Sequence, residues 1–208
     1  IKVWPLINDF NKDIDYKTLF SVRSNRRKLI DTLMRDAVSY GYDGINLDFE
    51  NIRNEYAKDF LQFIRELALE CHKNNIVLST DNYKPEAYNK FYNLKEQSSY
   101  VDYVVVMAYD EHYAGSEAGS VASLPFVREA VSDTIDMVPS KQVIVGIPFF
   151  TRIWSISGQT TTSRAVGMQA AIDELNADGK TAPWNEDAGQ YVSCLLYTSP
   201  SPRDTERS

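Results

Sequence analysis

Short apolar runs and longer stretches with helical periodicity alternate along this chain. The runs rich in Val, Ile, Leu and Phe predict strands at residues 3–7, 43–50, 76–80, 101–109 and 143–149. Apolar side chains that recur every three or four residues predict helices at residues 26–40, 56–73, 124–137 and 166–175. Because strands and helices follow one another in turn, the pattern predicts an α/β fold with a parallel sheet, either open or closed into a barrel.

The predicted helices carry apolar stripes and recognisable ends. Gly41 follows the first helix as a stop signal, and Pro125 falls in the first turn of the third, where proline is tolerated. The stripe of the first helix comprises Ile30, Leu33, Met34, Ala37 and Val38; that of the second comprises Phe60, Leu61, Ile64, Leu67, Ala68 and Cys71.

The strand at residues 43–50 reads Asp-Gly-Ile-Asn-Leu-Asp-Phe-Glu and is the most informative segment of the chain. Side chains two residues apart share a strand face, so Asn46, Asp48 and Glu50 lie on one face about 6.6 Å apart. Three such polar groups are costly to bury without a purpose. A half-exposed antiparallel strand would also explain them, but the alternation with helices favours a parallel sheet. The opposite face carries Ile45, Leu47 and Phe49.

Three motifs in order now point to a family. The segment from Asp43 to Glu50 resembles the DxxDxDxE signature of glycoside hydrolase family 18, with Asn46 where the second Asp usually stands. Residues 107–110, Met-Ala-Tyr-Asp, resemble that family's MxYD element, and residues 146–152 resemble its GxPFYxR strand. Asn46 and residues 110–120 look most similar to the bacterial branch that degrades cell-wall and spore-cortex peptidoglycan.

The resemblance implies a (β/α)8 TIM barrel with its active site at the carboxyl ends of the strands. By this reading the chain is an incomplete barrel that runs from about strand 3 to helix 7, within residues 1–193. Residues 194–208 include CLLYTSPSPRD, which looks like a translated sequencing adapter, and we expect them to be a non-native tail. We therefore expect a truncated fragment that is inactive by itself, from an active parent enzyme.

The family's mechanism implies a role for each matching residue. Glu50 would protonate the glycosidic oxygen while the substrate's own 2-acetamido carbonyl attacks C1, with net retention. Asp48 would bond the acetamido N–H and stabilise the developing positive charge. Tyr109 would hold the acetamido carbonyl in attack geometry. The substrate would be a polymer with β-1,4 bonds next to N-acetylglucosamine, such as peptidoglycan or chitin.

Further residues are expected to bind this substrate. Asn46 is the departure from the family pattern: an Asp there shares a proton with its neighbour, whereas Asn can donate a hydrogen bond to Asp48 but cannot carry charge. The aromatic side chains of Tyr83, Tyr113, Phe150 and Trp154 are candidates for stacking on sugar rings or for ordinary packing. The residues assigned to substrate binding are Asn46, Met107, Asp110, Arg152 and Trp154.

Composition narrows the functional classes. The formal net charge is −7, and the absence of a basic cluster argues against nucleic acid and anionic membranes as partners. No run of about 20 apolar residues predicts membrane insertion. The histidines are His72 and His112, and no HExxH or CxxC spacing predicts a metal site, so we expect neither metal nor cofactor. The family implies an extracellular, cell-envelope or spore-associated location.

Two other functions stay open at this point. A non-catalytic, lectin-like relative would keep the barrel and its aromatic residues but usually lacks the acid, and Glu50 argues against it. A sugar isomerase or aldolase barrel would need a metal cluster or a Schiff-base Lys at a strand end, and neither is evident. The polymer attacked and the oligomeric state are not determined by the sequence.

Overall fold

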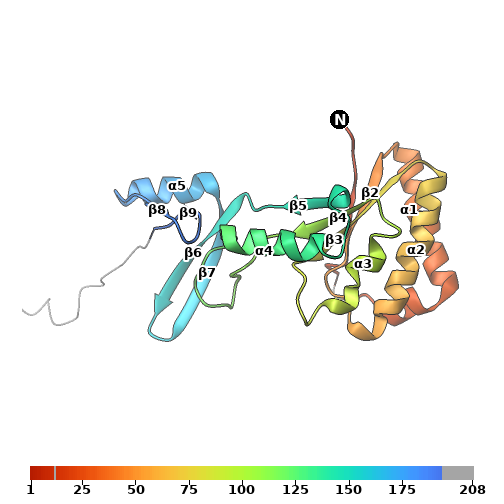
Figure 1. Ribbon diagram of the computed structural model, residues 1–208, viewed down its shortest axis with the longest axis horizontal. Coiled ribbons are helices and arrows are strands. Elements are labelled where there is room, and N and C mark those ends of the chain that lie inside the picture. The colour runs from red at the N-terminus through yellow and green to blue at the C-terminus, as the bar shows by residue number, and fades with distance from the viewer. Residues whose placement is uncertain (12, 194–208) are drawn as a thin grey trace, which may run out of the picture.

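The computed structural model describes residues 1–11 and 13–193. It places two long helices and the parallel sheet at one end, and an antiparallel hairpin with the last helix at the other (Figure 1). The expected tail, residues 194–208, lies outside the described residues. Five parallel strands pair in chain order: β1 (Leu6–Asn8), β2 (Gly44–Asp48), β3 (Val77–Tyr83), β4 (Tyr103–Met107) and β5 (Val143–Gly146). All four connections are parallel crossovers, as the alternating pattern predicted.

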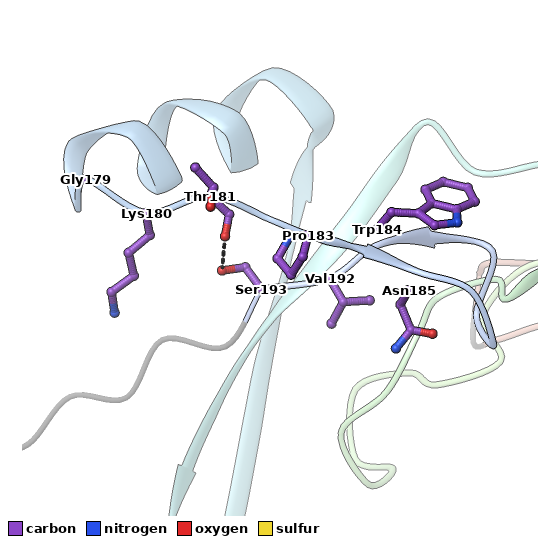
Figure 2. Close-up of a pocket in the computed structure, with 8 residues that line it drawn as sticks. All are labelled: Gly179, Lys180, Thr181, Pro183, Trp184, Asn185, Val192 and Ser193. Atoms are coloured by element: carbon purple, nitrogen blue, oxygen red, sulfur yellow. Dashed lines mark hydrogen bonds between the residues drawn. The ribbon is translucent and has the colours of Figure 1, made fainter.

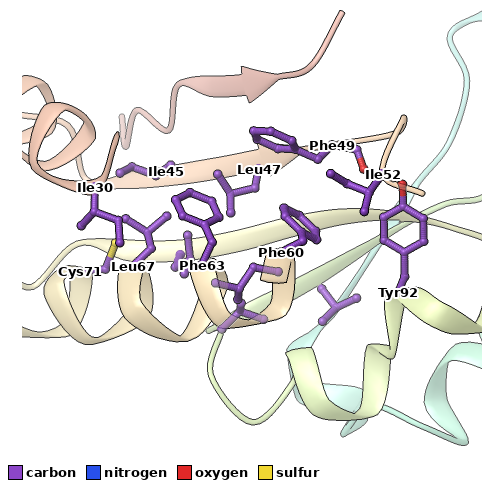
Figure 3. Packing of buried hydrophobic residues seen from close by; sticks show 14 of the residues in the cluster. Ile30, Ile45, Leu47, Phe49, Ile52, Phe60, Phe63, Leu67, Cys71 and Tyr92 are labelled. Atoms are coloured by element: carbon purple, nitrogen blue, oxygen red, sulfur yellow. Dashed lines mark hydrogen bonds between the residues drawn. The ribbon is translucent and has the colours of Figure 1, made fainter. Parts of the chain in front are cut away.

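Helices α1 (Arg23–Tyr40) and α2 (Ala57–Lys73) bury one face of this sheet. The apolar face of β2 packs against them, because Ile45, Leu47 and Phe49 all point to that side (Figure 3). Phenylalanine rings fill the interface, with centroids of Phe20 and Phe63 only 5.1 Å apart. Each fully buried apolar side chain of this size contributes about 1.5–3 kcal/mol to folding. This core holds β2 rigidly from behind.

The helix ends follow the predicted signals. Gly41 ends α1 with a φ of 68°, a left-handed conformation that glycine adopts without steric cost, and its N–H bonds the carbonyls of the last turn. The Ser123 hydroxyl caps α4 (Leu124–Ile135), and Pro125 lies in the first turn. One stripe position was wrong: Val38 is 60% exposed.

The chain beyond β5 departs from the predicted alternation. Residues 150–167 form an antiparallel hairpin of β6 (Phe150–Ser157) and β7 (Thr160–Gly167). The helix predicted at 166–175 is α5 (Met168–Ala177), and Val166 instead pairs with Thr151 in the hairpin. Helix α5 packs on β6 and β7, not on the parallel sheet, so it does not close another β/α unit. The remaining short elements are α3 (Leu94–Gln97), β8 (Trp184–Asn185), β9 (Gln190–Tyr191) and four single helical turns, η1 (Lys17–Ser21), η2 (Asn54–Tyr56), η3 (Lys90–Tyr92) and η4 (Ser140–Gln142).

The second face of the parallel sheet carries the polar side chains. Strand β3 extends to Tyr83, beyond the predicted end at residue 80, because Asp81 and Asn82 continue its pairing with β4. Asn46 lies level with Ser79 across the β2–β3 pair, on the face opposite Leu47. In a parallel sheet the carboxyl ends of all strands meet at one edge, and the acidic side chains gather there.

Candidate active site

Four chain segments meet at the carboxyl edge of the sheet, and together they bring five titratable side chains. Asp48 is the last residue of β2, and Glu50 follows it. Asp9 comes directly after β1, Asp81 lies within β3, and Tyr109 follows β4. These side chains lie at or just after the strand ends, where parallel sheets usually bind ligands.

Asp48 is a buried acid with a free oxygen. The residue is only 6% exposed, and its Oδ1 atom has no hydrogen-bond partner among the described residues. Burial, followed by the negative charges of Glu50, Asp81 and Asp9, raises the pKa of Asp48 to about 7. At neutral pH this carboxyl therefore exchanges readily between its charged and neutral forms.

The position of Glu50 is held from two sides. Its backbone N–H donates to Oδ1 of Asp9 at 3.0 Å, and the neighbouring Asn51 N–H donates to the other Asp9 oxygen at 2.8 Å. The Tyr83 hydroxyl donates to Oε2 of Glu50, and this contact together with burial raises the pKa of Tyr83. Tyr83, a candidate for sugar stacking by sequence, is thus a hydrogen-bond donor to the candidate acid.

Asn46 forms no hydrogen bond with Asp48, which differs from the expectation from the sequence. Its amide N–H donates to Oδ2 of Asp81 at 2.9 Å, and its carbonyl oxygen accepts the Ser79 hydroxyl at 2.6 Å. The register explains the difference, since the side chain level with Asn46 on the same sheet face belongs to β3. Asn46 therefore links Asp81 and Ser79 to the strand that carries Asp48.

Tyr109 stands over the end of β5. Gly146 makes this possible, because a Cβ there would lie 3.3 Å from the Tyr109 ring. The Phe150 ring packs edge-on against Tyr109 at 6.3 Å, and burial raises the pKa of Tyr109 to about 12. Met107, at the end of β4, lies beneath this layer and is buried, with only 6% of the residue exposed.

Asp110 and Arg152 face each other at the rim. Asp110 adopts a left-handed φ of 57°, and its Oδ1 lies 4.0 Å from Arg152 Nη2. In the described part of the chain no hydrogen bond joins Asp110 to Glu50. Arg152 donates to the Ser163 hydroxyl at 3.2 Å. Trp154, farther along β6, donates its indole N–H to the Gly119 carbonyl at 2.9 Å, so it pins the loop after β4.

Sequence reasoning missed two acids, Asp9 and Asp81. Asp81 was missed because the predicted strand stopped at residue 80, where the apolar run ends. Asp9 follows an apolar run, which is the same signal that identified the end of β2. Asp9 is 1% exposed and also accepts the Tyr16 hydroxyl at 2.8 Å, so its charge is satisfied by donors from two loops.

Other features of the described residues do not compete with this site. They hold no group of three His, Cys, Asp or Glu side chains suited to a metal ion. No helix among them has the length and apolarity needed to span a bilayer. A cavity of about 610 Å³ lies beside β8 and β9 (Figure 2), away from the predicted site residues; it is lined by Gly179, Lys180, Thr181, Pro183, Trp184, Asn185, Val192 and Ser193.

Known proteins resemble this chain in sequence and in fold. YvbX, an uncharacterised glycosylase of Bacillus subtilis (strain 168), is 30% identical over 178 residues, which cover 79% of this chain and 52% of YvbX. The cortical fragment-lytic enzyme of the same organism is 24% identical over 198 residues, covering 91% of this chain and 46% of that enzyme. The chain thus spans about half the length of these curated relatives.

A solved structure confirms the fold class. The crystal structure of YdhD, a candidate sporulation-specific glycosylase from Bacillus subtilis, matches with a TM-score of 0.83 at 24% identity, covering 90% of this chain and 65% of that chain. The five parallel strands are therefore part of a (β/α)8 barrel. The sequence profile of the glycosyl hydrolases family 18 matches residues 1–200. The chain belongs to family 18 of the glycosyl hydrolases, as its three motifs indicated.

Proposed function

We propose that the protein is a retaining glycoside hydrolase that cleaves β-1,4 bonds next to N-acetylglucosamine, with peptidoglycan as its polymer. The observation that carries this proposal is the pair formed by Glu50 and Asp48 at the end of β2. Glu50 is partly exposed, whereas Asp48 is buried with one free oxygen. An accessible acid beside a buried, unpaired carboxyl suits a reaction in which positive charge develops between them.

In this reaction Glu50 gives its proton to the glycosidic oxygen as the bond from that oxygen to C1 breaks. The acetamido carbonyl oxygen of the same sugar forms a new bond to C1, which yields an oxazolinium ion. Water then attacks C1 from the vacated side, the bond from C1 to the acetamido oxygen breaks, and the water gives a proton to the Glu50 carboxylate. The acid is regenerated, and the β configuration is retained.

The neighbouring groups stabilise the intermediate. Asp48 accepts the acetamido N–H through its free Oδ1, and the positive charge on the oxazolinium favours the ionised form of Asp48. Tyr109, with a pKa of about 12, stays protonated at neutral pH and donates to the acetamido carbonyl oxygen. Met107, Asp110, Arg152 and Trp154 shape the sugar site around them.

Peptidoglycan is favoured over chitin by the relatives. Glycosylases and cortical fragment-lytic enzymes of Bacillus precede the insect chitinases among the similar proteins, at 30% against 23% identity for the first of each kind. Two of the names, sporulation-specific glycosylase and cortical fragment-lytic enzyme, refer to the spore and support a spore or cell-wall polymer. We accordingly propose that the enzyme acts in the cell envelope, on the spore or outside the cell.

The test is Glu50→Gln in the protein that carries this chain, with spore-cortex fragments and chitin oligomers as substrates. Turnover of the cortex fragments should fall at least ~100-fold, because general acid catalysis contributes that much or more. Substrate binding should persist, since Gln keeps the shape of the side chain. Glu55→Gln is the matched control, because Glu55 follows the same strand and its side chain is 59% exposed.

Two outcomes would contradict the proposal. Near-normal turnover in Glu50→Gln would mean that another residue supplies the acid. Tight binding of the polymer by the wild-type protein without release of reducing ends would favour the non-catalytic, lectin-like alternative.

A further inference from the structure

A second buried acid, Asp81, lies beside Asp48 and takes no part in the steps proposed above. The β2–β3 register pairs Asn46 with Ser79 and Leu47 with Thr80. One residue further along, the same register brings Asp48 level with Asp81, on strands about 4.8 Å apart. Both side chains face the same side of the sheet, because side chains level with each other in a parallel pair share a face.

The two acids resemble each other in their surroundings. Each has an Oδ1 atom that is buried and has no hydrogen-bond partner among the described residues. The other oxygen of Asp81 is taken by the Asn46 amide at 2.9 Å, and Ser79 fixes the orientation of that amide at 2.6 Å. Asp81 thus sits in a defined position, with a free oxygen on the sheet face that carries Asp48.

We propose that Asp81 is a positioning residue for Asp48: it anchors Asn46 and, as a second carboxyl beside Asp48, sets whether Asp48 carries a proton when the sugar binds. The proposal rests on the proposed function, in which Asp48 contacts the acetamido group. It assigns to β3 a residue that the β2 motif does not contain.

The charges around Asp48 support this assignment. Three acids face it from three strand ends: Glu50 after β2, Asp81 on β3 and Asp9 after β1. Tyr109, from the end of β4, is neutral at pH 7 and faces the same acids. Burial raises the pKa of Asp81 to about 6, although the Asn46 hydrogen bond opposes the rise. Among the described residues no Lys or Arg pairs with Asp48 or Asp81.

The charge of Asp48 can be measured without substrate. In Asp81→Asn of the protein that carries this chain, carboxyl ¹³C NMR should show the pKa of Asp48 falling by about one unit or more, since one like charge is removed. The acidic limb of the kcat/KM profile should move to lower pH by a similar amount. Asp36→Asn is the matched control, because Asp36 is an exposed α1 residue paired with Arg35. Its substitution should leave both quantities unchanged.

The reciprocal exchange Asn46→Asp with Asp81→Asn provides a rescue. It returns a carboxyl to the same sheet face and preserves the amide-to-carboxylate hydrogen bond with the partners reversed. The acidic limb should move back toward its wild-type position. Where Asp81→Asn does not fold, Asn46→Asp alone serves: one more carboxyl beside Asp48 should raise the pKa of Asp48 and move the limb to higher pH.

An unchanged pKa of Asp48 in Asp81→Asn would overturn the proposal, whatever the activity. The same holds for an unchanged pKa in Asn46→Asp when that variant replaces it. A fallen pKa in a protein that hydrolyses none of the polymers would support the Asp81 assignment and count against the proposed function. The two proposals therefore fail separately.

Discussion

At the scale of single residues, the arrangement of acids in the site lowers the stability of the fold. Asp48 is buried without a cation and leaves one oxygen unpaired, which is costly in a low-dielectric interior. Its pKa is raised from 3.8 to about 7, so between about pH 4 and 7 the folded protein holds a proton that the unfolded chain releases. The stability of the fold therefore falls as the pH rises through this window.

Replacing Asp48 with Asn should remove this dependence. At pH 8 Asp48→Asn should raise Tm by about 2 °C or more, because a charged buried group is exchanged for a neutral one. The gain should shrink as the pH approaches 4, where the wild-type acid is already protonated. Thermal unfolding at several pH values measures this, with Asp36→Asn as the exposed control. A variant that is less stable than wild type at pH 8 would contradict the sign.

At the scale of elements, one side chain ties two strand ends together. The Asp9 carboxylate, directly after β1, accepts hydrogen bonds from the backbone N–H groups of Glu50 and Asn51 after β2. It also accepts hydrogen bonds from the Asn51 side-chain amide and the Tyr16 hydroxyl. A carboxylate is suited to this position because it offers acceptors only. The loop that carries Glu50 is thereby fixed to the sheet.

Asp9→Asn should loosen that loop. One acceptor becomes an N–H donor that faces other donors, which costs about 1–3 kcal/mol of stability. In the protein that carries this chain we expect kcat/KM to fall about 10-fold or more, since a small displacement of the acid lowers the rate strongly. Tyr16→Phe is the matched control: it removes one hydrogen bond to Asp9 and leaves the backbone bonds of Glu50 intact. Equal losses of activity in both variants would show that Asp9 does not position Glu50.

At the scale of the whole molecule, the sheet ends at two outer strands, β1 and β5. Within the described part of the chain, each of them pairs on one side only. Apolar side chains are exposed along and after β5, among them Val145 at 38%, Ile147 at 56% and Phe149 at 84%. Unpaired strand edges with apolar side chains template pairing between chains. The same surfaces are closed off in a complete barrel.

The 208-residue chain expressed alone should therefore self-associate and show no hydrolase activity. Light scattering after size-exclusion chromatography measures the first property. The double variant Ile147→Lys with Phe149→Lys should reduce the association, because edge charges oppose strand pairing. Leu69→Lys is the control, since Leu69 is 64% exposed on α2, away from the edge. A monodisperse monomer with measurable turnover would contradict the prediction.

The sequence pattern was sufficient to predict those elements whose formation depends on residues close together in the sequence. Helical periodicity, the Gly41 stop and the Pro125 turn predicted α1, α2 and α4 within a few residues. The strand alternation around Asp48 predicted which face is buried, because the side-chain period of a strand is two. The hairpin of β6 and β7 was missed, although Gly158 in a two-residue link between β-branched runs is a typical hairpin signal. Helix α5 was also predicted within a few residues, but its packing on this hairpin was not.

The sequence by itself determined the parallel α/β sheet, the family and the position of Glu50 and Asp48 at a strand end. Tertiary structure alone decided which side chains surround those two acids. Asn46 bonds Asp81 and not Asp48, and Asp9 holds the backbone of Glu50 across more than forty residues of chain. Such contacts depend on the register between strands that are distant in sequence, and a one-residue slip would turn every side chain to the other face. The amino-acid composition of a single segment does not determine that register.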